Sequence, residues 1–132
     1  MTITDLLKAG LEHYQRGNLE GAEKKFRQVI LVDNRNIHGL NLLGMICVNT
    51  GRHEEAVHLI TDALKISPTD AQAQGNLGLA YQRMGNLKLA ESCFRKSIEL
   101  GGKNRTIFNS LGNVLRESGR ASEAVQVYES TL

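Results

Sequence analysis

The sequence lacks a long apolar run. Its longest apolar stretches, residues 29–32 and 42–48, fall far short of the roughly 20 residues that span a bilayer. The N-terminal residues also lack the basic segment and the continuous apolar segment of a secretory signal. These absences exclude a transmembrane helix, and we expect a cytoplasmic protein that does not insert into membranes.

Cysteine is scarce as well. The chain has two, Cys47 and Cys93, which are too far apart for a Cys-x-x-Cys zinc motif and too few for a disulfide framework. We expect both to be packed thiols, since free cysteine is among the most buried residue types. Arg95 and Lys96 follow Cys93 closely, and neighbouring cations of this kind are expected to lower the pKa of a thiol.

An excess of charge of one sign is missing too. The chain has 16 Lys and Arg against 14 Asp and Glu, a formal net charge of +2. Because nucleic-acid binding requires a concentrated basic face, we expect no nucleic-acid partner. With 41% hydrophobic and 23% charged residues, the 132-residue chain has the composition of one ordered domain, residues 1–132. Basic residues dominate residues 71–104 and acidic residues dominate 37–70, an asymmetry suited to head-to-tail association.

What the sequence does contain is a period of 34 residues, shared by two glycine series and one alanine series. The three series are Gly10, Gly44, Gly78 and Gly112; Gly17, Gly51, Gly85 and Gly119; and Ala22, Ala56, Ala90 and Ala124. A fixed period of this length predicts stacked structural units. The boundaries that it predicts are 3–36, 37–70, 71–104 and 105–132, with the last unit incomplete.

Each unit is predicted to be a helix, a turn and a second helix, because apolar residues recur at helical spacing on both sides of the turn. Small residues such as Gly78 and Ala90 would let the two helices approach closely, and the bulky Phe94 would fill the space between them. Gly85 is expected to end the first helix in the left-handed conformation, and Asn86 to cap the second.

These residues make the chain resemble the tetratricopeptide repeat family. The second unit matches it most closely, with Leu40, Gly44, Ala56 and Pro68. The resemblance covers essentially the whole chain and implies an all-α fold, a right-handed superhelical solenoid of antiparallel helix pairs with about 3.5 to 4 repeats. Gln74 departs from the pattern, because a bulky apolar residue is usual at its place.

In this family the first helix of each unit lines a concave groove, which implies a protein or peptide partner. The residues expected to line it are Leu7, Leu11, His38, Asn41, Met45, Gln72, Asn76, Leu79, Arg83, Asn109, Asn113 and Arg116. Those in the first two units are largely apolar and are expected to accept side chains. Those in the last two units are mainly amides and arginines, which could clamp the main chain of an extended peptide.

Both sets have a plainer interpretation. Leu42, Met45 and Leu79 could complete contacts between successive first helices, because apolar residues at helical spacing more often belong to a core. The asparagines could form a solvated polar face. The carboxylate clamp of chaperone-binding members is not indicated, since Leu7 and Asn41 stand where its lysine is expected.

Two further functions stay open. The asparagine-lined groove is similar to the repeat arm of O-linked N-acetylglucosamine transferases, and residues 39–44 are similar to arrays that precede bacterial glycosyltransferase-like domains. The chain could therefore be the substrate-recruiting arm of a larger enzyme. It could also be a self-assembling scaffold, a homo-oligomer in which Val125, Tyr128 and Leu132 of an uncapped C-terminal helix dock on another copy.

No constellation of catalytic residues is present. His53 and His58 lie about 140° apart around a helix and do not converge on one metal ion. Glu54 shares a face with His58, but a third ligand is missing. The glycines follow the repeat period and form no phosphate-binding loop. We therefore expect a binding module without enzymatic activity, metal or cofactor.

Overall fold

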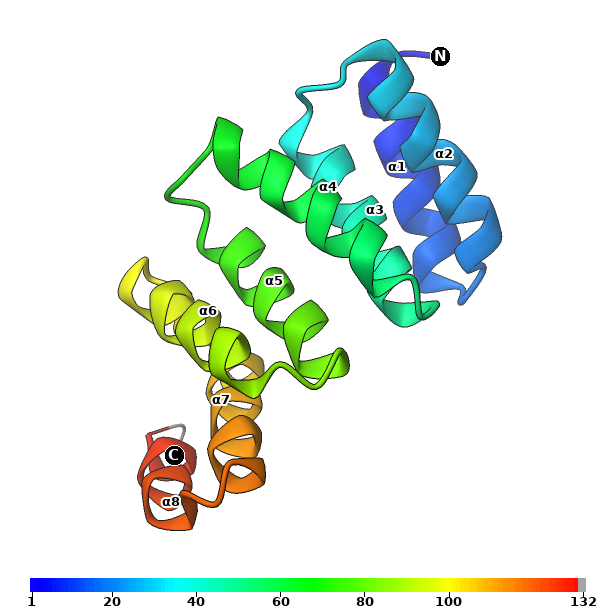
Figure 1. The fold of residues 1–132 in the computed structure, drawn as a ribbon. Coiled ribbons are helices and arrows are strands. Elements are labelled where there is room, and N and C mark those ends of the chain that lie inside the picture. The colour runs from blue at the N-terminus through cyan, green and yellow to red at the C-terminus, as the bar shows by residue number, and fades with distance from the viewer. Residues whose placement is uncertain (131–132) are drawn as a thin grey trace. The chain divides into compact units, whose positions relative to one another are not determined.

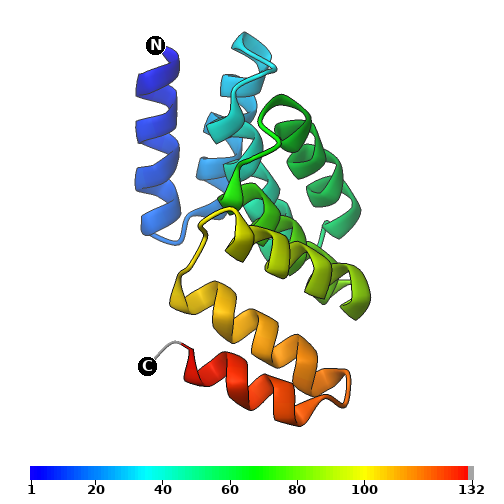
Figure 2. The same cartoon turned by 90° about the vertical axis from the view of Figure 1, so that its left-hand side faces the viewer.

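Every element that the structure describes is an α-helix. The computed structural model describes residues 1–130, and among these there are eight helices and no strand. The helices are α1 (Ile3–Gln15), α2 (Leu19–Val32), α3 (Ile37–Asn49), α4 (His53–Ile66), α5 (Ala71–Arg83), α6 (Leu87–Glu99), α7 (Arg105–Glu117) and α8 (Ala121–Glu129). Each successive pair forms an antiparallel hairpin (Figures 1 and 2). The all-α prediction is confirmed.

The helices belong to two compact units. Unit 1 is Met1–Pro68 and contains α1 to α4, and unit 2 is Thr69–Leu132 and contains α5 to α8. In unit 1, α1 packs on α2, α3 packs on α4, and α2 contacts α3. In unit 2, α5 packs on α6, α7 packs on α8, and α7 contacts both α5 and α6. We call α1, α3, α5 and α7 the first helices and their partners the second helices.

A glycine on each first helix makes room for a bulky side chain of the second helix. Phe94 is fully buried, and a Cβ atom built on Gly78 would lie 2.6 Å from its Cε1 atom, closer than real Cβ atoms approach other atoms. Ala90, one turn before Phe94, is fully buried as well. The corresponding contacts join Gly10 to Phe26, Gly44 to Ile60 and Gly112 to Tyr128. The predicted steric role of this glycine series is confirmed.

The turns inside the helix pairs depend on a second set of glycines, whose φ angles lie between 79° and 82°. These are Gly17, Gly51, Gly85 and Gly119. Side chains with a Cβ atom rarely adopt this conformation. After two of these turns an asparagine caps the second helix: Asn18 accepts a hydrogen bond from the Gly21 amide at 3.0 Å, and Asn86 accepts one from Leu89 at 3.2 Å. The predicted turns and caps are confirmed.

Replacing Gly78 with alanine should lower the free energy of unfolding by about 1 to 2 kcal/mol. Crowding against the buried Phe94 ring outweighs the gain in helix propensity, which is about 1 kcal/mol. The control is Gly21→Ala, whose nearest neighbours would be side-chain atoms of Asn18 and His13 rather than a fully buried ring, so it should cost less. Urea denaturation measures both. The double variant Gly78→Ala/Phe94→Leu should lose less stability than the sum of the two single variants, and a Gly78→Ala protein as stable as wild type would contradict this packing.

Candidate functional site

Helix α1 carries an apolar surface that includes two of the predicted groove residues. Leu7 and Leu11 are four residues apart and therefore share one face of the helix. Leu11 is 39% exposed, and Leu7 is half-buried against the core around Phe26. Both line a hollow of about 450 Å³, together with Thr4, Lys8, Glu12 and Gln15. This hollow is large enough for an apolar side chain of a partner and has a polar edge.

Helix α3 exposes less of its predicted groove. His38 is exposed and Met45 is half-buried, but Asn41 is only 6% exposed. Leu42 packs against the core around Phe26, which favours the packing interpretation of this leucine. Because Asn41 is buried, it does not belong to a solvated polar face.

The predicted groove residues of α5 are exposed only near the two ends of the helix, at Gln72 and Arg83. Between them, Leu79 packs against the core around Phe94, which again favours a packing role. Asn76 is 8% exposed, and its amide nitrogen is buried without a hydrogen-bond partner among the described residues. A solvated polar face therefore does not describe Asn76 either.

Helix α7 presents the most accessible polar stripe. Asn109, Asn113 and Arg116 follow one another at intervals of four and three residues, so they lie on one face. Asn109 and Arg116 are exposed and Asn113 is half-buried. The Tyr128 hydroxyl donates a hydrogen bond to Oδ1 of Asn113 at 2.5 Å. This bond occupies the amide oxygen of Asn113 and leaves its two N–H groups as donors for a partner.

The repeat pattern can now be compared with known families. A family model described as tetratricopeptide repeat matches residues 35–101 and again residues 69–132. Together these matches cover well over half of the chain. The chain belongs to the tetratricopeptide repeat family. The resemblance carried by the periodic glycines and alanines is thus confirmed, and the protein belongs to a family of protein-interaction modules.

Curated relatives of this tetratricopeptide repeat protein are longer than it is. Human tetratricopeptide repeat protein 7B is 29% identical over 93 residues, which cover 70% of this chain and 11% of that protein. The type IV pilus assembly protein PilF of Pseudomonas aeruginosa is 32% identical over 84 residues, which cover 64% of this chain and 33% of that protein. The chain therefore spans a third or less of the length of these two relatives.

Solved structures share the fold at low sequence identity. MamA from Desulfovibrio magneticus RS-1 has a TM-score of 0.86 and 18% identity, over 98% of this chain and 73% of that one. A Thermobaculum terrenum O-GlcNAc transferase mutant has a TM-score of 0.83 and 23% identity, over 86% of this chain and 22% of that one. At these identities the likeness shows the tetratricopeptide repeat fold alone.

The sequence prediction missed a hollow on unit 1. It has a volume of about 220 Å³ and is lined by Arg27, Ile30, Leu31, Leu43 and Leu59. Leu31 at its edge is 85% exposed, more than any other leucine among residues 1–130. A sequence signal was available, because the residues one and two periods after this leucine are charged, Lys65 and Glu99.

Charged residues of the second helices form a cluster in unit 1. Arg52 donates to both carboxylate oxygens of Glu23, at 2.6 and 2.8 Å. Arg27 donates to Glu23 at 2.9 Å and to Glu55 at 3.0 Å. The Arg52 guanidinium, with help from Arg27, lowers the pKa of Glu23 from an ordinary 4.5 to about 2. Glu23 therefore stays ionised in the folded protein well below the pH at which an unfolded chain would protonate it.

A matching cluster lies in unit 2, two periods further along the chain. Arg120 donates to Glu91 at 2.6 Å and also to Glu123, and Arg95 donates to Glu91 at 2.9 Å. The arginines of the first helices, such as Arg116, stand outside both clusters.

The two cysteines are buried and free, as expected. The prediction that Arg95 and Lys96 lower the pKa of Cys93 is wrong. Burial raises the pKa of this thiol to about 11, and burial likewise raises the pKa of Cys47 to about 11. Loss of hydration disfavours the thiolate, so neither cysteine is activated as a nucleophile.

Several other predicted features can be placed. Of the residues expected to be uncovered on the last helix, Val125 is 53% exposed and Tyr128 is half-buried, while Leu132 lies outside the described residues.

No group of three or more His, Cys, Asp or Glu side chains in residues 1–130 could hold a metal ion. In the same part of the chain no helix has the length and apolar character needed to cross a bilayer.

Replacing Glu23 with glutamine should lower the free energy of unfolding by about 1 kcal/mol at pH 7, where both arginines lose a charged partner. Because the pKa of Glu23 is lower in the folded state, its contribution is complete above about pH 4.5 and is lost as the pH falls towards 2. The stability difference should therefore shrink over this range. Urea denaturation from pH 7 to 2 measures it, with Glu12→Gln on α1 as the control. A difference that is independent of pH would contradict this assignment.

Proposed function

We propose that the protein is an interaction module that binds an extended peptide, or a helix, of a partner protein on its first helices. The hollow on α1 at Leu7 and Leu11 carries this proposal. It lies on residues that the family pattern assigns to ligand binding, and it offers an apolar cavity at the surface. Apolar side chains of a partner would lose contact with water there, which is the main driving force for association.

The polar stripe on α7 supports a second binding surface, which belongs to unit 2 alone. Asn109 and the N–H groups of Asn113 can pair with main-chain groups of a bound segment, and such pairing does not depend on its sequence. Arg116 is exposed beside them and adds a cation for an acidic group. We propose that unit 1 binds partner segments by their apolar side chains, and that unit 2, by itself, binds them by main-chain hydrogen bonds.

The distribution of charge agrees with partner binding on the first helices. The arginines and glutamates of the two clusters lie on the second helices or directly before them. Within each cluster they form ion pairs with one another. Exposed arginines of the first helices, Arg83 and Arg116, belong to neither cluster. The transferase-arm and scaffold hypotheses stay predictions, because the likeness to the transferase and to MamA is one of fold. The cytoplasmic location stays a prediction as well.

The test uses peptides selected on the wild-type protein from a random display library, because no natural partner sequence is needed. Leu11→Ala should weaken binding of the peptides that bind unit 1, and Asn109→Ala that of the peptides that bind unit 2, each by about fivefold or more in calorimetric titration, since each variant removes a central contact. Both side chains are at the surface, so the thermal stability of the protein should hardly change.

The matched controls lie on second helices. Leu89→Ala on α6 removes a leucine of similar exposure, 43% against 39% for Leu11, and Gln126→Ala removes an exposed amide comparable to that of Asn109. Both should leave peptide affinity unchanged. If peptides from independent selections lose affinity with the second-helix variants and not with the first-helix variants, the proposed binding surface is refuted.

A further inference from the structure

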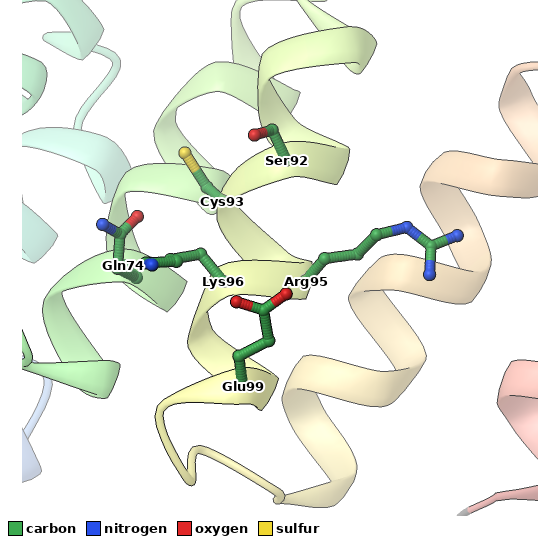
Figure 3. Close-up of a pocket in the computed structure, with 6 residues that line it drawn as sticks. All are labelled: Gln74, Ser92, Cys93, Arg95, Lys96 and Glu99. Carbon is green, nitrogen blue, oxygen red and sulfur yellow. The ribbon is translucent and has the colours of Figure 1, made fainter.

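A polar hollow on unit 2 lies outside the residues expected to bind a partner. It has a volume of about 450 Å³ and belongs to a single helix pair, with one wall residue on α5 and the others on α6 (Figure 3). Its lining residues are Gln74, Ser92, Cys93, Arg95, Lys96 and Glu99. None of them takes part in the binding surface proposed above.

The hollow exists because the α5–α6 pair lacks an apolar residue that the neighbouring pairs have. One period before Gln74 the chain has Leu40, which is 2% exposed, and one period after it has Phe108. A glutamine is more polar than either residue and costs free energy when its amide is buried without partners. Gln74 is half-buried at the wall of the hollow and does not fill it.

The same departure occurs on α6. One period before and after Cys93 the chain has Leu59 and Val127, and both of these pack against an apolar core. Cysteine is smaller than either. Two positions that are apolar and bulky in the neighbouring pairs are therefore small or polar here, and the resulting space is lined by hydrogen-bonding groups.

The charged side chains of the hollow differ in their direction. In Figure 3 the Lys96 side chain extends towards Gln74, while the Arg95 guanidinium extends in the opposite direction. Arg95 is held there by Glu91, at 2.9 Å. Glu99 contributes one carboxylate to the same wall. Burial raises the pKa of the Cys93 thiol to about 11, so it is uncharged at pH 7 and does not repel an anion.

We propose that this hollow binds a carboxylate, held by the Lys96 ammonium and the amide N–H groups of Gln74. Lysine and a primary amide together offer several donors, and a hydrogen bond from an ammonium group to a carboxylate is among the stronger ones in proteins. The Ser92 hydroxyl supplies a further donor at the rim. The negative charge of Glu99 repels a bound carboxylate and so lowers the affinity. Removing this charge should therefore raise the affinity, whereas removing the charge of Lys96 should lower it. The carboxylate belongs to an acidic side chain or to the C-terminus of a bound chain.

Two small probes distinguish these sources in titrations of the ¹⁵N-labelled full chain followed by NMR. N-acetylglutamic acid α-amide carries only a side-chain carboxylate, and N-acetylglycine carries only an α-carboxylate. At least one should cause saturable shifts at the Gln74 side-chain amide and at the amides of Ser92 and Cys93, at constant ionic strength. The tighter probe identifies the source. The uncharged N-acetylglutamine α-amide should bind more weakly.

Variants give the decisive comparison. Lys96→Gln should weaken binding of the better probe about fivefold or more, and Glu99→Gln should strengthen it, because the two charges act on an anion with opposite sign. Lys88→Gln, on the same helix but outside the hollow, is the matched control and should have no effect. Gln74→Leu restores the residue of the preceding pair, so it should abolish binding while the protein stays folded by circular dichroism.

The proposal is overturned if neither probe gives saturable shifts, or if the uncharged probe binds as tightly as the acids. It is also overturned if Lys88→Gln weakens binding as much as Lys96→Gln, which would indicate general attraction to a basic helix. Lys96→Gln and Glu99→Gln alter surface side chains, so the comparison of their signs stands even if Gln74→Leu fails to fold.

Discussion

The contact between a glycine on one helix and a bulky side chain on the next holds each helix pair together, and the other features depend on it. At Gly78 the missing Cβ atom lets the buried Phe94 ring lie against the helix backbone. Burying such a ring contributes about 2 kcal/mol, a considerable part of the roughly 5 to 15 kcal/mol that stabilises a typical domain. Once this contact fixes a pair, the outward face of its first helix and the spacing of its turn follow from helix geometry.

Charge adds a second level of organisation. The clusters of unit 1 and unit 2 each consist of two glutamates and two arginines at positions two periods apart, centred on Glu23 and Glu91. One period after the first cluster the equivalent positions hold Val57, Thr61, Asn86 and Leu89. These uncharged side chains cannot form a third cluster. Each of the two compact units thus contains one cluster. Because partly exposed ion pairs stabilise weakly, each cluster adds only modestly to the free energy of unfolding.

The parts of the fold that repeat could be predicted from the sequence, because their causes are local. The positive φ of Gly85 and the cap at Asn86 depend on a few adjacent residues. The candidate site was less accessible to prediction, because exposure depends on packing between helices. Asn76 and Asn109 are both amides on first helices, yet one is buried and the other exposed. For Cys93 the nearby cations were visible in the sequence, but the burial that outweighs them was not.

Departures from the period carry information that the period itself does not. Leu31 is largely exposed, so its side chain contributes little buried apolar surface to the fold. Gln74 replaces an apolar side chain that is buried in the preceding pair, where the equivalent residue is Leu40. In a repeat protein each pair contacts only its neighbours, so the cost of such a departure stays local and the other pairs keep their geometry. Both departures lie beside hollows at the surface. The repeats thus act as internal controls for one another: a position whose polarity differs from that of its equivalents in the other pairs marks a place where the local structure is free to serve binding.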